Sequence, residues 1–230
     1  MMLKGNHLMI LVLGNFISNM ILSNTSFASN SKENYASVSI EMLKEAGIDF
    51  ERHKTNGIDP LTFAEHLTTS GLILMPNIYW ICFHGLFDFA YLLRLVSNEV
   101  CLPKDEFDFQ TALQLYFPNA YDVKTLAEPW SHLQGSLSRL CQELRINRIG
   151  IQHQAGSDSL ITAAAFFKLK EEYYEDKEIL EENRNKLFGI GVEDDYINEF
   201  QMKGWYDIRY TCVPWMRQRT IMSRHNINGY

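Results

Sequence analysis

The pattern of apolar and polar residues along the chain predicts several helices and a few short strands. It predicts helices over 39–46, 62–69, 86–97, 106–117, 134–144 and 158–176. It predicts strands over 71–75, 79–83 and around 120–123. We expect residues 98–105 to form a loop, with Pro103 before the next helix. Helices and strands arranged in this order are typical of a single layered α/β domain.

One acidic residue stands in strongly apolar surroundings after the strand predicted at 79–83. His84 and Gly85 predict a turn, and the segment Leu86 to Val96 is apolar on nearly every face, which predicts a buried helix. Asp88 is the only acidic residue of that helix. Burying a lone carboxylate is costly unless a partner compensates its charge. A divalent cation such as Mg²⁺, an ion pair with Arg94 or a capping contact would each do so.

A histidine and an aspartate flank the start of the last long helix. Gly156 and Ser157 predict a turn followed by an N-cap, so that the helix runs from Asp158 to Asp176. His153 then lies on the loop that enters the helix, and Asp158 lies on its first turn, both facing one cleft. This arrangement offers a proton acceptor beside an anionic metal ligand. The alternative is an ordinary capped helix with a surface histidine.

Composition sets limits on the class of protein. A length of 230 residues suits one domain with irregular ends, and a net charge of −7 argues against a strong general nucleic-acid binder. Four basic residues could contact nucleic-acid phosphates locally, or they could simply lie scattered on the solvated surface: Lys124, Arg139, Arg145 and Arg148. Three aromatic residues could stack on nucleic-acid bases or pack in the protein core: Tyr79, Phe87 and Tyr121.

The cysteines suggest neither a zinc site nor a disulfide framework. Cys82, Cys101, Cys141 and Cys212 form no Cys-x-x-Cys pair and have no zinc-like histidine spacing. We expect free, buried thiols in a reducing compartment.

Several segments together resemble the CAF/POP-type deadenylases, the catalytic exonuclease subunits of the Ccr–Not complex. The most specific match is the segment 153–160, from His153 to Leu160. Further matches are found at 63–71, 83–89, 116–124 and 187–192. The similarity runs from about Ser37 to Asp195, which defines the expected exonuclease domain.

The resemblance implies an RNase H-like α/β fold of the DEDD exonuclease superfamily, with a mixed sheet flanked by helices. Such enzymes remove adenosines from the 3′ end of messenger RNA, using four acidic residues, a histidine and two divalent ions, Mg²⁺ or Mn²⁺. On the matching positions, Asp88 and Asp158 would be metal ligands and His153 the general base. The implied partners are poly(A) RNA, the Ccr–Not scaffold and a second deadenylase subunit, in cytoplasm and nucleus, with no membrane.

The sequence departs from the family pattern at two of the four acidic ligands. The family places an Asp-x-Glu pair on its first strand, and no such segment precedes residue 37. The triplets beginning at Asp49 and at Asp176 do not correspond to it, and the second is expected to be a solvated charge run at a helix end. We therefore expect weak or absent catalysis and a sheet that lacks its first strands. Leu86 stands where the family usually has glycine, and it could crowd a close approach.

Three hypotheses remain beside active deadenylation. The first is a non-catalytic relative that binds the Ccr–Not scaffold, and a weaker one is a different DEDD exonuclease. The third is a secreted protein, because the atypical apolar segment 1–36 resembles a signal peptide with a small-residue cleavage site at Ala28. We favour instead a remnant of the sheet or an altered start. Residues 196–230 form a divergent tail, either an arm that contacts RNA or a partner, or an unselected extension.

Overall fold

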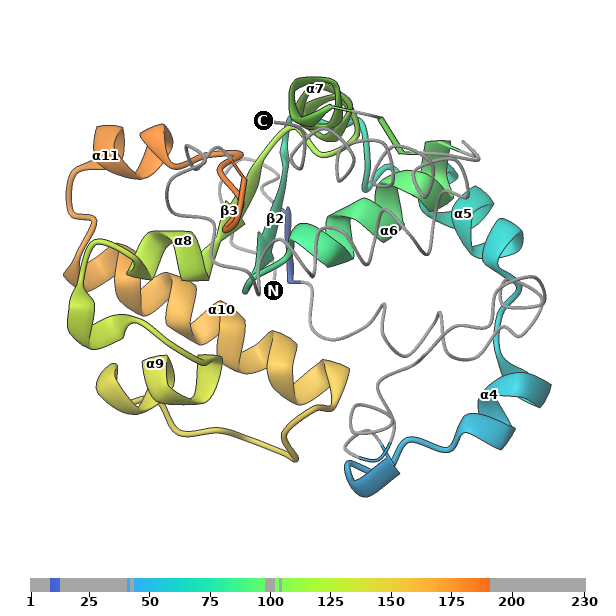
Figure 1. Ribbon diagram of the computed structural model, residues 1–230, viewed down its shortest axis with the longest axis horizontal. Helices are drawn as coiled ribbons and strands as arrows, with labels where there is room; N and C mark the ends of the chain where they lie inside the picture. Colours follow the sequence, from blue (N-terminus) through green and yellow to red (C-terminus); the bar gives the residue numbers. More distant parts are fainter. Residues whose placement is uncertain (1–8, 13–40, 42–43, 98–101, 104, 191–230) are drawn as a thin grey trace, which may run out of the picture.

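The computed structural model describes residues 9–12, 41, 44–97, 102–103 and 105–190. At the centre of these described residues lies a parallel sheet of three strands in the order β1-β2-β3: β1 (Met9–Val12), β2 (Ile78–Cys82) and β3 (Ala120–Asp122) (Figure 1). The register pairs Met9 with Ile78 and Cys82 with Asp122. The expected α/β class is confirmed.

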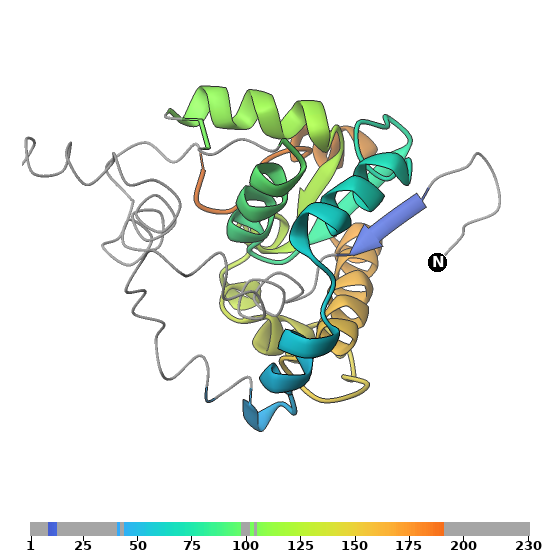
Figure 2. The ribbon, with the colours of Figure 1, turned by 90° about the vertical axis from the view of Figure 1, so that its right-hand side faces the viewer.

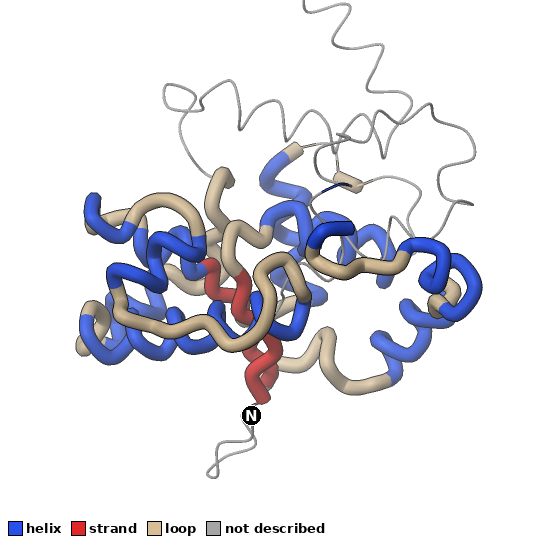
Figure 3. The backbone as a smooth tube through the Cα atoms, turned by 90° about the horizontal axis from the view of Figure 1, so that it is seen from below, coloured by secondary structure: helices blue, strands red, loops and turns tan. Residues whose placement is uncertain are grey.

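Helices cover both faces of this sheet. Figure 3 shows the strands between two groups of helices. One group contains α5 (Pro60–Thr69), α6 (Leu86–Ser97) and α7 (Glu106–Tyr116), and α4 (Phe50–Asn56) precedes it in the chain. The other group contains α8 (Val123–Ala127), the 3₁₀ turn η1 (Ser131–Leu133), α9 (Leu137–Glu143), α10 (Ala155–Glu172) and α11 (Lys177–Glu182).

The alternation of side chains along β2 divides the core into two halves. Ile78, Trp80 and Cys82 pack with α6 and α7, where Trp80 meets Phe89 and Phe117 edge to face. Ile81 points to the opposite face and packs in a second cluster with residues of α8, α9 and α10. A strand that is apolar on both faces is typical of a buried parallel sheet.

The strand expected at 71–75 is wrong. Those residues form turns and bends, with φ values of +73° at Gly71 and +60° at Leu74 that a strand does not accommodate. The Leu74 N–H donates instead to the carbonyl of Tyr116 at 2.8 Å. The apolar character of the segment reflects burial of Ile73, which is 2% exposed, rather than pairing in the sheet.

Two helix starts differ by three residues from those expected, and α5 begins two residues early, at Pro60. α10 begins at Ala155, three residues earlier than expected, because His153 makes the turn with a φ of +66°. Ser157 is therefore not the N-cap but a buried residue of the first turn, and Gln154 occupies the N-cap position without a side-chain hydrogen bond. α9 begins later than expected, at Leu137, with Ser136 as its N-cap.

The apolar N-terminal segment contributes to the sheet through Met9–Val12. Figure 2 shows β1 (blue) as the end strand beside β2, close to α10. The rest of the segment 1–36, the tail 196–230, Cys101 and Cys212 lie outside the described residues, as does part of the helix expected at 39–46, where residues 41, 44 and 45 are helical. Within the described residues, no helix is long and apolar enough to span a membrane.

Candidate functional site

The turn that leads from β2 into α6 carries Asp88 to the carboxyl end of the sheet. His84 adopts a φ of +58°, and the helix begins two residues later. A Cβ atom on Gly85 would lie 2.4 Å from the Cys82 Sγ atom, so only glycine fits there. The Leu86 side chain is buried in the core, so it does not crowd a binding cleft as the sequence suggested it could.

This turn is held by Asp122, a residue that sequence reasoning did not single out. Its carboxylate accepts backbone N–H hydrogen bonds from His84 (2.8 Å), Gly85 (3.0 Å), Lys124 (3.0 Å) and Phe188 (3.2 Å). The side chain is fully buried. Asp122 thus fastens three segments of the chain around the start of α6. Its position between a strand and a helix was the available signal, since aspartate often caps a helix.

Asp88 lies in the first turn of α6 and is partly exposed. Burial by its apolar neighbours, with the nearby Asp122 carboxylate, raises the pKa of Asp88 to about 7. Burial, together with the charges of Asp122 and Asp88, also raises the pKa of the Cys82 thiol well above its usual value. The site therefore concentrates negative charge, which a cation would compensate.

Lys124 lies on the other side of the turn. Its Nζ atom is 3.4 Å from the His84 Nδ1 atom and 4.1 Å from the centroid of the Phe188 ring. Burial, followed by the charge of Lys124, lowers the pKa of His84. Among the basic residues considered for phosphate contacts, Arg139 and Arg145 lie exposed, whereas Lys124 is held in this aromatic corner.

At the start of α10, the structure places His153 just before the helix and Asp158 in its first turn. Asp158 is buried and forms an ion pair with Arg148, whose guanidinium also donates to the Ser157 hydroxyl at 3.1 Å. Gln154 donates to the carbonyl of Ala46 at 2.8 Å, which ties this helix start to an earlier segment. Arg148 is thus a counter-ion rather than a free phosphate ligand.

His153 and Asp158 share one helix start, but Asp88 belongs to a helix that packs on the opposite face of the sheet (Figure 1). Carboxylates suit Mg²⁺ or Mn²⁺ in type. Nevertheless, within the described residues no three His, Cys, Asp or Glu side chains gather closely enough to hold a metal ion. The described residues therefore fit only part of a two-metal site.

The other residues considered from the sequence have structural roles. Asp49 accepts from the Arg52 N–H at 2.9 Å at the start of α4, and Asp176 is the N-cap of α11, so both Asp-x-Glu triplets begin helices. The placement of the second triplet at the end of a helix is corrected accordingly. The aromatic residues pack in or against the core: Tyr121 is buried and stacks on Tyr79, and Phe87 lies against the other cluster.

Comparison with known proteins matches residues 64–166 to the CAF1 family ribonuclease. The chain is 44% identical over 160 residues to the probable CCR4-associated factor 1 homolog 10 of Arabidopsis thaliana, covering 70% of this chain and 57% of that protein. It is 43% identical over 157 residues to the poly(A) ribonuclease pop2 of Schizosaccharomyces pombe, covering 68% and 46%. It therefore spans about half the length of these relatives.

Solved structures give the same result. The Mg²⁺- and Mn²⁺-bound form of S. pombe Pop2p is similar with a TM-score of 0.63 at 40% identity, over 69% of this chain and 62% of that chain. Yeast CAF1, crystallised with the NOT1 MIF4G domain, is similar with a TM-score of 0.56 at 27% identity, over 62% and 58%. The expected RNase H-like fold is confirmed, residues 64–166 match the CAF1 family ribonuclease, and the chain is homologous to the CCR4-associated factor and Pop2 deadenylases.

Proposed function

We propose that this chain is a 3′ exoribonuclease that removes adenosines from poly(A) RNA. The observation that carries the proposal is that Asp88 and Asp158 both lie in first turns of helices packed on one sheet, in a fold shared with metal-bound Pop2p. A helix start stabilises an ionised carboxylate, and carboxylate oxygens are the ligands that Mg²⁺ prefers. We also propose that the chain assembles with the Ccr–Not scaffold. The support is that one relative is named a CCR4-associated factor and that a similar structure contains CAF1 with the NOT1 MIF4G domain.

The proposed roles follow from the chemistry of each side chain. Asp88 and Asp158 would hold divalent cations, which when bound activate water and stabilise the leaving 3′ oxygen. His153 lies partly exposed on the turn before α10, where its imidazole would act as the general base for the attacking water. Arg148 keeps the Asp158 carboxylate oriented and offsets its charge.

The test is a shortening assay with a 5′-labelled RNA that ends in an adenosine tail, in Mg²⁺ and in Mn²⁺. Asp158→Asn and Asp88→Asn are the active-site variants, and Asp176→Asn, which alters an exposed helix cap, is the matched control. We expect slow stepwise shortening that both active-site variants abolish and the control retains. Circular dichroism of each protein establishes that loss of activity is not loss of fold.

A second candidate function is favoured by the Arg148–Asp158 ion pair and by the incomplete donor set among the described residues. It is a non-catalytic relative that binds the Ccr–Not scaffold. Folded protein that shortens no RNA in either metal, yet binds a NOT1 MIF4G domain in a pull-down, would select this candidate over the nuclease.

A further inference from the structure

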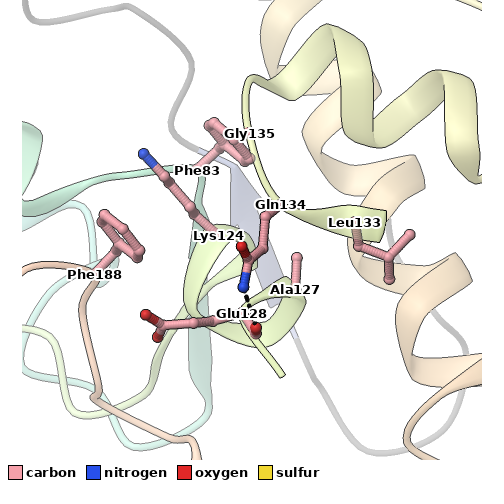
Figure 4. Close-up of a pocket in the computed structure, with 8 residues that line it drawn as sticks. All are labelled: Phe83, Lys124, Ala127, Glu128, Leu133, Gln134, Gly135 and Phe188. Carbon is pink, nitrogen blue, oxygen red and sulfur yellow. Dashed lines mark hydrogen bonds between the residues drawn. The ribbon is translucent and has the colours of Figure 1, made fainter. Parts of the chain in front are cut away.

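A pocket of about 160 Å³ lies beside the turn that precedes Asp88, and none of the three proposed catalytic residues lines it. Figure 4 shows its side chains. Its lining includes apolar side chains from Phe83, Leu133 and Phe188 and polar side chains from Lys124, Glu128 and Gln134. The pocket thus combines flat apolar walls with a cation, a carboxylate and an amide.

The pocket lies at the edge of the sheet where ligands of parallel α/β folds usually bind. Phe83 directly follows β2, and Lys124 lies in α8, which directly follows β3. Both positions are therefore at the carboxyl ends of parallel strands. The Asp122 carboxylate joins this region to the Asp88 turn, because it accepts from the N–H groups of Gly85, Lys124 and Phe188.

The size of the pocket limits what it can hold. Pockets for drug-sized ligands have volumes of roughly 300–1,000 Å³. At about 160 Å³, this pocket accepts a single ring system rather than a whole nucleotide. The rest of such a ligand would extend past Lys124, which is partly buried.

The polar groups indicate which ring system fits. Lys124, held beside His84 and Phe188, presents positive charge to an anionic group on the ligand. Glu128 is exposed, and its carboxylate can only accept hydrogen bonds, so it favours a ring that carries N–H donors. Gln134 donates to the Glu128 carbonyl at 2.8 Å, which fixes the wall between them.

We propose that this pocket is a subsite for one adenine base, with Lys124 facing the phosphate of the same nucleotide and Glu128 accepting from the exocyclic amino group. Adenine carries such an amino group and uracil does not, so the pocket selects adenine over uracil. The identification of poly(A) RNA as the source of the base rests on the proposed function. Free AMP presents the same chemistry.

The experiment measures binding of AMP and of UMP to the whole chain by calorimetry in buffer with a chelator, so that no metal contributes. Mononucleotides exclude the self-stacking of an adenosine tail as the source of a preference. We expect AMP to bind about tenfold more tightly than UMP, the lower end for a hydrogen bond to a charged group, because Glu128 is exposed.

Three variants test the assignment. Glu128→Gln should reduce the AMP preference to within about threefold, since an amide can also donate to uracil. Glu65→Gln, which alters an exposed glutamate on α5, is the matched control and should leave the preference unchanged. Lys124→Met should weaken AMP binding without weakening adenosine binding, a difference that general loss of structure does not produce.

Equal binding of AMP and UMP by the unmodified chain, or a preference that Glu128→Gln leaves intact, overturns the assignment. Competition by an oligo(A) decamer identifies RNA as the source, whereas competition by AMP alone identifies the free mononucleotide. The shortening assay remains independent: selective AMP binding without shortening retains the pocket and removes the nuclease. RNA shortening by a chain that binds AMP and UMP equally retains the nuclease and removes the adenine subsite.

Discussion

The two aspartates predicted as metal ligands lie in different electrostatic surroundings. Asp158, at the start of α10, is buried against the Arg148 guanidinium, which compensates its charge. Asp88, at the start of α6, lies near a second carboxylate, Asp122, and its pKa is raised to about 7. The comparison teaches that a fold can compensate one carboxylate with an ion pair and leave another with a raised pKa, which an incoming cation would lower.

The largest effect is expected at Asp122, the residue that organises the Asp88 region. Asp122→Ala leaves four backbone N–H groups without their acceptor, and each buried unsatisfied donor costs ~1–3 kcal/mol. We expect a loss of about 4 kcal/mol or more in the free energy of unfolding, measured with urea. Asp176→Ala, which removes an exposed cap on α11, should cost only about 1 kcal/mol. Equal losses would show that Asp122 is an ordinary cap.

The next largest loss of stability is expected when the ion pair between Arg148 and Asp158 is broken. Arg148→Gln leaves a buried carboxylate without its counter-ion, and we expect it to lower the free energy of unfolding by about 2 kcal/mol, because Arg148 is itself 19% exposed. Asp158→Asn should cost less, since Arg148 still reaches solvent and the Ser157 hydroxyl. Mn²⁺ should raise the melting temperature of Arg148→Gln more than that of Arg148→Gln/Asp158→Asn. No difference between the two would argue against Asp158 as a metal ligand.

A smaller loss of stability is expected from a substitution in the turn between β2 and α6. Gly85→Ala places a methyl group 2.4 Å from the Cys82 Sγ atom, a clash that requires the chain to shift. Overpacking of this kind costs about 1–3 kcal/mol. The Cys82 Cβ atom would lie 2.5 Å from the same methyl group, so the cost should fall when Cys82→Gly, rather than Cys82→Ala, is combined with it in a double-mutant cycle monitored by thermal unfolding. Strictly additive losses would mean that the glycine is needed for a reason other than the Cys82 side chain.

The smallest effect is a shift in a single titration. Burial and the Lys124 charge lower the pKa of His84, so the folded protein binds this proton less readily than the unfolded chain. The stability contributed by neutral His84 is therefore present above its ordinary pKa and is lost as the pH falls below that value. In an NMR titration, Lys124→Met should move the pKa of His84 part of the way up, with burial keeping it low. An unchanged His84 pKa would contradict the contact.

Much of the fold follows from local pattern, and the exceptions have identifiable causes. The turns at His84 and His153 require positive φ values at non-glycine residues, which neither hydrophobic periodicity nor capping preference indicates. The helix start at Ala155 was missed for this reason. The short helix α8 was missed because five residues, Val123–Ala127, are too few to show a helical period.

The sequence by itself determined the positions of β2, β3 and the long helices, the resemblance to deadenylases, and the placement of Asp88 and Asp158 at helix starts. These depend on local periodicity and on residue identity along short stretches. Only the tertiary structure showed that Asp122 binds N–H groups 38 and 66 residues away, and that Lys124 meets Phe188 beside a pocket. Such contacts depend on where the whole chain folds back on itself, and the free energy that fixes them comes from packing both faces of the sheet.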